Sequence, residues 1–517
     1  MICVLATLIF SIPAVQTKLA NYATDRINKD FGTNLKIDKV KVSLISWDTA
    51  IEGIYAEDDK KDTLFYINNL TTSVLDMNNL IKGQLEFDGI DLDGLLLKLK
   101  TYKGEKESNL EVFVDKLDDG KPRKKGTPPF KLLSSAVNIT NSRFQLIDEN
   151  LEKPKTLDFK DLNIKSDTFL ILGPDVRADI AALSFQSRRG PFVEKLKTDF
   201  KYSKTQMRFD SLSIKTKESD LKGKLAFNYD RKDFKDFLNL VQVEADFADS
   251  EVRTDELNLL FNEFGSGKKI TFTTGVNGTL NDLKTKKLLL FTDDTGVRGD
   301  FNFKNLFNIQ EPFVLDADIK NITSSYYQLR GLLPKIMNND NLPEFVQKLG
   351  RFTVRGKAMV TETSMDAKIN IDTGIGKSYT DIQITNINNI ETASYKGFVS
   401  LIDFDLGKFL DDSQLGKTTS DINVEGRGFL TETLNTEIIG KVYHLDFNGY
   451  RYKDANVSGI LKEQLFDGSL ISKDENFKFN FKGLADFSEE NNNFNFVASV
   501  DYADFRALNF IKDSVSI

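Results

Sequence analysis

The sequence predicts a mainly β protein whose strands are apolar on one face only. Three observations predict it. In residues 477–487, FKFNFKGLADF, apolar residues and glycine alternate mainly with lysine, asparagine and aspartate, and a strand places alternate residues on opposite faces. The same alternation recurs through most of the chain. The composition changes nowhere sharply enough to divide the chain into separate globules.

Glycine occupies a recurring place in these segments, within the pattern apolar-x-Gly-x-apolar. The pattern is found in residues 221–229, 297–303, 352–360, 422–430 and 477–487. A glycine inside a strand marks a bulge, a bend or a close approach of another group. We expect bends here, in preference to space for a ligand.

Composition excludes several classes of protein. A hydrophobic share of 40% and a charged share of 28% are typical of a chain that folds. Cys3 is the single cysteine, so the chain forms no internal disulfide. The net charge is -8, with both signs interspersed, which argues against nucleic acid as a partner.

Chemistry-bearing side chains are scarce, because Cys3 and His444 are the only cysteine and the only histidine. Most hydrolase and zinc mechanisms need a cluster of such groups. His444 lies in the alternating segment VYHLDF and is interpreted as a strand residue at the surface. We therefore expect no enzyme, no catalytic or metal-binding residue and no cofactor.

Two short motifs resemble ligand loops but depart from them. Residues 265–268, GSGK, would end a phosphate loop, but Asn262 and Lys269 replace its first glycine and its final serine or threonine. We expect a turn before a strand at 270–274. A calcium loop in DGIDLDG would begin at Gly89 and end at Lys100, which supply no carboxylate.

Residues 1–15, MICVLATLIFSIPAV, carry no charge. They are fewer than the ~20 residues of a membrane-spanning helix, and they lack the basic start of a signal peptide. We favour a membrane anchor whose natural start lies upstream; a cleaved signal peptide is the other interpretation. The anchor candidates are Ile2, Val4, Leu5, Leu8, Ile9 and Phe10.

Residues 16–115 are interpreted as an amphipathic helix followed by a cap of strands. From Val15 to Phe31 the apolar residues recur at spacings of three and four, and Gly32 is placed to end the helix. The helix would either lie on a membrane surface or cap the first strands.

Residues 35–99 predict a compact series of strands. The alternation changes phase between Ile37 and Val40, which predicts a bulge. The dipeptides at 88–89 and 93–94, both Asp-Gly, predict turns.

Residues 116–130 predict a linker, because charge, glycine and proline are combined there. Its basic cluster is interpreted as a solvated loop, with anionic lipid headgroups as the other partner considered; it comprises Lys121, Arg123, Lys124 and Lys125. Residues 131–517 then predict strands at 136–147, 157–165, 176–187, 196–202, 207–216 and onward, with short helices at 233–241, 326–337 and 342–349. We expect this body to continue in a longer chain.

The apolar face of so many strands needs a cover, since exposing one phenylalanine or leucine costs about 1.5 to 3 kcal/mol. A second sheet would cover it in stacked β-sandwiches. One long antiparallel sheet would instead curl into a groove lined by that face, and alternation alone leaves both open. The candidate lining residues are Phe227, Phe301, Phe303, Phe352, Val354, Ile369, Ile371, Ile422, Val424, Phe477, Phe479, Phe481, Phe494 and Phe496.

Several segments resemble a known family. They are residues 12–47, IPAVQTKLANYATDRINKDFGTNLKIDKVKVSLISW, with 53–70 and 80–99, and the repeat-like segments 332–361 and 449–487. They resemble bacterial TamB and AsmA-like proteins, in the form found in Bacteroidota, and the resemblance spans nearly the whole chain as its N-terminal part. Its motifs are patterns of apolar residues and glycine.

The resemblance implies a long curled antiparallel β-sheet groove, or half-pipe, with an N-terminal membrane helix and a few short helices. It implies a single-pass anchor in the inner (plasma) membrane and a body in the periplasm. The implied role is in outer-membrane biogenesis, by phospholipid transport or autotransporter-type protein secretion or both. The implied partners are membrane phospholipids, the inner membrane and an Omp85-type outer-membrane protein. A structural or adhesive cell-surface protein of stacked β-sandwiches is the competing hypothesis.

Overall fold

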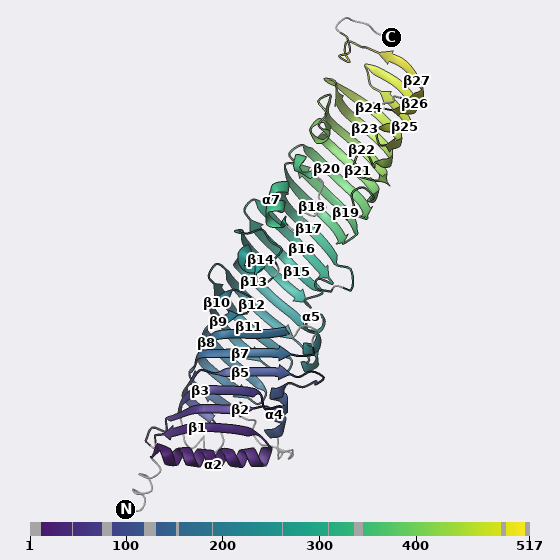
Figure 1. Cartoon of the computed structure of the whole chain (residues 1–517). Coiled ribbons are helices and arrows are strands. Elements are labelled where there is room, and N and C mark those ends of the chain that lie inside the picture. Colours follow the sequence, from purple (N-terminus) through teal and green to yellow (C-terminus); the bar gives the residue numbers. More distant parts are fainter. Residues whose placement is uncertain are drawn as a thin grey trace, which may run out of the picture. The chain divides into compact units, whose positions relative to one another are not determined.

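The computed structural model describes residues 12–43, 45–74, 85–117, 131–150, 155–188, 190–260, 262–308, 310–334, 345–486 and 493–511. The fold is mainly β, as predicted: 27 strands are assigned to one sheet, and the helices of the described residues are few (Figure 1). Contacts divide the chain into two units. Unit 1 comprises Met1–Lys235 and Val241–Leu260, and unit 2 comprises Asp236–Leu240 and Phe261–Ile517.

The elements of unit 1 are α2 (Pro13–Phe31), β1 (Asn34–Val42), β2 (Thr49–Glu57), β3 (Thr63–Val74), β4 (Leu85–Asp93), β5 (Leu96–Thr101), α4 (Asn109–Leu117), β6 (Lys131–Ser134), β7 (Val137–Asp148), β8 (Lys155–Leu172), β9 (Asp175–Ser187), β10 (Phe192–Tyr202), β11 (Gln206–Thr216), β12 (Asp220–Asn228), β13 (Gln242–Arg253) and α6 (Thr254–Asn258). A 3-10 helix, η1 (Arg231–Asp236), follows β12.

The elements of unit 2 are α5 (Phe237–Leu240), β14 (Lys269–Gly278), β15 (Leu283–Thr292), β16 (Thr295–Lys304), β17 (Val314–Ser325), α7 (Tyr326–Leu332), α9 (Phe345–Lys348), β18 (Arg351–Thr361), β19 (Ser364–Thr373), β20 (Gly376–Thr385), β21 (Ser394–Asp405), α10 (Leu406–Leu410), β22 (Leu415–Arg427), β23 (Asn435–Phe447), β24 (Tyr450–Lys462), β25 (Leu465–Lys473), β26 (Phe477–Asp486) and β27 (Phe494–Ala503). The strands predicted between 136 and 216 are confirmed as β7 to β11, with β8 extending to Leu172.

Sequential antiparallel pairing dominates both units. In unit 1 it joins β1 to β2, β2 to β3 and each strand from β7 to β13 to the next. In unit 2 it joins each strand from β14 to β27 to the next. The sheet thus grows by one strand at a time along the chain.

The expectation of a wholly antiparallel sheet is wrong at one place. β4 pairs in parallel with β6 and β7, and β5 pairs in parallel with β7. Parallel neighbours need a crossover connection, and the chain between β5 and β6 contains α4. This helix was not predicted from the sequence.

Helix α2 is confirmed where the amphipathic pattern placed it. It begins at Pro13, a residue suited to the first helical turn because it needs no intrahelical N–H bond. It ends at Gly32, whose φ of 64° gives the left-handed cap that glycine adopts readily. The predicted anchor residues Ile2 to Phe10 lie outside the described residues. Within the described part of the chain, no helix has both the length and the apolar content to cross a bilayer.

The interpretation of α2 as a cap is confirmed. β1 pairs with β2 on one side, and α2 lies along its other edge (Figure 1). The Gln16 side chain donates from Nε2 to the Val42 carbonyl at 2.8 Å and accepts from the Val42 N–H at 2.8 Å. Asn28 makes the same pair of bonds with Leu35, at 2.8 and 2.7 Å. Two side-chain amides therefore replace a neighbouring strand. Leu19 and Tyr22 of α2 stay exposed.

The phase change in β1 is confirmed, but the predicted bulge is wrong. Val40 is buried and Ile37 is half-buried, with Asp38 and Lys39 exposed between them. The register of β1 and β2 nevertheless contains no extra residue. Both strands change phase together at Asp38 and Gly53, and the φ of 67° at Gly53 makes this possible without steric strain.

Neither of the two predicted turns reverses the chain. Asp93 ends β4, and Gly94 adopts a φ of 67° in the break before β5, but β5 continues in the direction of β4, because both strands pair in parallel with β7. Asp88 and Gly89 lie within β4, where the register with β3 shifts between Ser73 and Val74. The Asp-Gly pair there marks a bulge.

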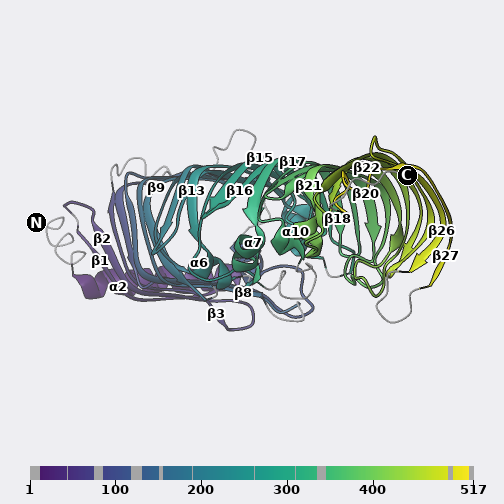
Figure 2. The same cartoon turned by 90° about the horizontal axis from the view of Figure 1, so that it is seen from above.

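The predicted helices are confirmed within the described residues. α7 and α9 cover the described parts of the segments 326–337 and 342–349, and η1 with α5 covers 233–241. α7 and α10 each begin directly where a strand ends, with Ser325 and Asp405 as N-caps that accept hydrogen bonds from Gln328 and Lys408 (Figure 2). The GSGK segment is a turn before β14, as predicted.

The cap predicts a specific loss of stability. Gln16→Ala should leave the N–H and C=O of Val42 without partners and destabilise the β1 edge by about 1 to 3 kcal/mol. Hydrogen exchange should then be faster at Val42 and its neighbours. Lys18→Ala, at an exposed position of the same helix, is the control and should change nothing. Equal protection of Val42 in both variants would contradict the cap.

Candidate functional site

The candidate site is an extended face of the sheet. In unit 2, directly paired residues form three rows that cross the strands from β16 to β27, with one residue from each strand. Residues paired directly across a sheet lie on the same face, so each row is a physical line of neighbouring side chains. We call the three rows together the apolar face.

The first row is Phe301, Ala317, Ala358, Ala367, Ile382, Gly397, Val424, Ile438, Gly459, Gly468, Gly483 and Phe496. The second is Phe303, Leu315, Val360, Met365, Ile384, Tyr395, Gly426, Thr436, Leu461, Phe466, Ala485 and Phe494. The third is Gly299, Ile319, Gly356, Ile369, Thr380, Val399, Ile422, Gly440, Val457, Leu470, Phe481 and Ala498.

The apolar face contains no charged residue. Its polar members are Thr380, Thr436 and the hydroxyl of Tyr395, which donates to the Gly428 carbonyl at 3.2 Å. Burial raises the pKa of Tyr395, so this group also stays neutral around pH 7. The face is therefore uncharged across twelve consecutive strands, from β16 to β27.

The predicted lining residues of unit 2 lie on this face or on the same side of its strands. Phe301 and Phe352 are buried, and Phe494 and Phe496 of β27 are 52% and 46% exposed. The others are half-buried: Phe303, Val354, Ile369, Ile371, Ile422, Val424, Phe477, Phe479 and Phe481. The structure tests their position only, and a role in binding lipid stays a prediction.

Unit 1 repeats this chemistry. A row of direct partners crosses β8 to β13 and comprises Phe169, Ala178, Phe200, Phe209, Leu225 and Ala245. Phe227 lies beside this row, where it pairs with Met207 and Val243 and is half-buried. The two units therefore share one pattern, an uncharged face on one side of successive strands.

The opposite side of the strands is charged and exposed. Ion pairs link neighbouring strands there, including Lys368 with Asp381 at 2.7 Å and Lys396 with Glu425 at 2.7 Å. Hydrogen bonds from these lysines to their carboxylate partners raise the pKa of Lys368 and of Lys396. Solvent screens such exposed pairs, so they contribute little to stability. Their main effect is to keep this side of the strands solvated.

The glycines within the strands lie where neighbouring backbones come close. A Cβ added at Gly223 would lie 2.0 Å from the Asp246 carbonyl oxygen, and one at Gly397 would lie 2.2 Å from that of Asp381. At Gly223 the register also shifts, as a bulge predicts; at Gly397 it does not. Close backbone approach explains these glycines without any ligand.

A second set of positions bends the strands, and sequence reasoning missed it. Polar residues in the left-handed conformation occur at register shifts inside strands: Asn141, Asp161, Ser211, Lys287 and Asp403, with φ between 46° and 53°. Each is exposed. An asparagine or aspartate beside a break in the alternation was the available signal, because these residues tolerate positive φ better than most.

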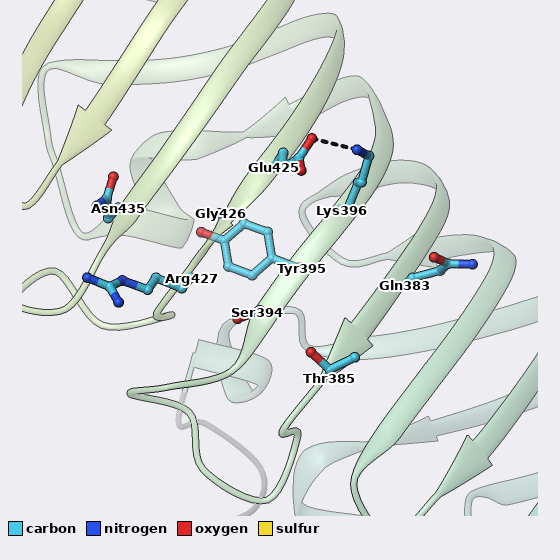
Figure 3. Close-up of a pocket in the computed structure, with 9 residues that line it drawn as sticks. All are labelled: Gln383, Thr385, Ser394, Tyr395, Lys396, Glu425, Gly426, Arg427 and Asn435. Atoms are coloured by element: carbon cyan, nitrogen blue, oxygen red, sulfur yellow. Dashed lines mark ion pairs between the residues drawn. The ribbon is translucent and has the colours of Figure 1, made fainter.

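One hollow lies over the strands β20 to β23. Figure 3 shows this hollow of 430 Å³, lined by Gln383, Thr385, Ser394, Tyr395, Lys396, Glu425, Gly426, Arg427 and Asn435. Of its three charged lining residues, Lys396 and Glu425 form an ion pair, and Arg427 is the third. His444 lies on β23 with Nε2 3.5 Å from Asp403 Oδ1. No group of three His, Cys, Asp or Glu side chains suited to a metal ion occurs within the described ranges.

Comparison with known proteins adds no assignment. No protein-family model matches the chain, and no curated protein matches it.

The glycine positions predict different tolerance to substitution within one unit. Gly223→Ala should force β12 and β13 apart and lower the free energy of unfolding by about 1 to 3 kcal/mol. Gly89→Ala, in β4, should be neutral to within about 0.5 kcal/mol, because an added Cβ there meets nothing within 4 Å. Urea denaturation of both variants measures the difference. Two equal unfolding curves would show that the strands at Gly223 can separate freely.

Proposed function

We propose that the apolar face binds the acyl chains of phospholipids and carries them along the sheet. On this proposal the protein is an inner-membrane-anchored periplasmic module of the TamB type. It supports outer-membrane biogenesis by phospholipid transport, by autotransporter-type protein secretion, or by both. It works without a cofactor and performs no catalysis.

The observation that carries the proposal is the unbroken apolar face of unit 2. Three adjacent rows cross twelve strands without a charged residue. Soluble proteins rarely expose contiguous apolar patches above a few hundred Å², and larger patches mark binding surfaces. Each CH₂ group of an acyl chain that leaves water for such a surface contributes about 0.8 kcal/mol, so a long chain gains enough to bind without any polar anchor.

The distribution of buried residues supports a groove over stacked sandwiches. The buried cluster of Phe301, Ala317 and Ile319 is packed by Leu288, Val297, Phe303, Leu315, Ile322 and Val354. All of these residues belong to four successive strands, β15 to β18. A sandwich core would combine residues from two facing sheets, whereas this cluster is a single layer of side chains.

The curled form of the groove is part of the proposal. Strands of unit 2 such as β22, β26 and β27 are drawn as arcs in Figure 2. The left-handed polar residues and the glycines at close backbone approaches are local causes of such bending, because bulges bend a strand and increase its twist. A half-pipe built in this way would hold acyl chains on one side and face water with the other.

Placement in the cell follows from the resemblance to TamB and AsmA-like proteins. We propose that the uncharged N-terminal residues anchor the chain in the inner membrane, with the sheet in the periplasm. Membrane phospholipids are then the cargo, and an Omp85-type outer-membrane protein is the proposed partner at the far membrane.

Crosslinking tests the proposal. A photoactivatable residue at Val457, on the apolar face, should crosslink to phospholipid in cells, and one at Ser458, exposed on the other side, should not. The double change Phe479→Asp and Phe481→Asp should lower the Val457 crosslink about tenfold or more, because carboxylates on the lining oppose apolar contact.

The matched control places carboxylates on the same strand but on its polar side. Asn480→Asp with Lys482→Asp should leave the Val457 crosslink unchanged. Lipid crosslinking that survives Phe479→Asp and Phe481→Asp would overturn the proposal. Mass spectrometry of the periplasmic part, purified without detergent, separates the two hypotheses: a lipid-binding groove retains phospholipid, and an adhesive protein of closed sandwiches retains none.

A further inference from the structure

Helix α4 covers apolar side chains of the first strands of unit 1. Phe113 of α4 is buried together with Ala56 and Leu64, and Leu35 and Phe65 pack against this cluster. The rings of Phe65 and Phe113 meet edge to face, with centroids 6.3 Å apart. The helix therefore packs on the apolar side of the first strands of the unit.

The covered residues belong to the same row of the sheet as uncovered ones. Leu35 pairs with Ala56, Ala56 with Phe65, and Phe65 with Leu97. Leu97 pairs with Phe144, which pairs with Phe159. The row thus runs from β1 to β8, and its residues are apolar both beneath α4 and beyond it. The residues that Phe113 contacts would therefore be equally suited to contact with an acyl chain.

Polar contacts among the described residues attach α4 at its start. Asn109, at its start, donates to the Lys98 carbonyl at 3.1 Å and accepts from the Lys100 N–H at 2.9 Å. It also donates to Asp58 Oδ2 at 3.1 Å. Ser108 and Glu111 close the first turn as a capping box. These contacts hold one end of the helix, and Phe113 with Leu110 supplies its apolar contact with the sheet.

We propose that the surface beneath α4 is a further acyl-chain site, and that Phe113 occupies it in the empty protein as a displaceable plug. The inference rests on the proposed function, since it takes the same lipid class as cargo. An acyl chain that advances along the row from β7 would compete with Phe113 for Phe65 and Leu35. The plug keeps this part of the row in unit 1 dry while no lipid is bound.

The test uses a photoactivatable residue at Phe65 in the full chain in cells, with a second probe at Phe481 in unit 2. In the unchanged helix the probe at Phe65 should crosslink within the chain, to α4. Phe113→Ala and Asn109→Ala should each shift it toward phospholipid, raising the lipid adduct about tenfold, which corresponds to about 1.4 kcal/mol of competition. Val114→Ala, at an exposed position of α4, should leave the adducts unchanged.

The outcomes separate this inference from the proposed function. Lipid at Phe481 but none at Phe65 in any variant would make α4 a permanent part of the unit and overturn the plug alone. No lipid at either probe would overturn the proposed function as well. Amide exchange of β1 to β3 checks folding: loss of protection throughout these strands in both Phe113→Ala and Asn109→Ala would show that α4 cannot be displaced, and would also overturn the plug.

Discussion

Strand register is the constraint on which this structure depends. Because side chains alternate along a strand, a slip of one residue moves every apolar side chain of that strand to the wet face. From β18 through β21 the pairing runs without any shift. Where it does shift, the shift preserves the pattern: Leu401 and Phe404 both lie on the apolar side because Asp403, with a φ of 46°, occupies a bulge between them. Bulges here keep the face continuous.

Alternation in the sequence predicted the strands and their apolar side well, because period two is a direct consequence of backbone geometry. Phe477, Phe479 and Phe481 lie on that side for this reason alone. The same reasoning failed where contacts with a segment distant in sequence decide the local structure. Asp88 and Gly89 have the composition of a turn, but pairing with β3 holds them in β4. Helix α4 is too short to show a clear amphipathic repeat in the sequence. The burial of its Phe113 depends on contacts with Ala56 and Leu64 of the sheet.

The parallel step between β5 and β7 shows another limit of local patterns. Sequence periodicity says that a segment is a strand, and nothing in it states the direction of its neighbour. Side-chain amides bond the backbone at the edges of some of these strands. Asn109 bonds the backbone of β5 at Lys98 and Lys100, as Gln16 and Asn28 bond the backbone of β1. An exposed strand edge invites unwanted pairing, and an amide side chain satisfies it because it carries the same donor and acceptor as a peptide group. A lone asparagine or glutamine in a helix gives no such signal in sequence.

The evenness of the apolar face bears on how the proposed cargo would move. A site that holds a ligand in one place needs a distinctive feature, such as a charge or a deep pocket, and conduction needs binding that is weak and repeated at many places. In the first row of unit 2, alanine and glycine occupy seven of the twelve strands. Larger residues flank them, including Ile369 and Phe481 in the third row and Phe466 in the second. An acyl chain on such a surface would meet similar contacts at each strand, so movement by one strand spacing exchanges equivalent contacts. The charge of a lipid headgroup would find no partner on this face, so the headgroup would lie toward solvent. A face with similar contacts at every strand would give the movement no direction of its own.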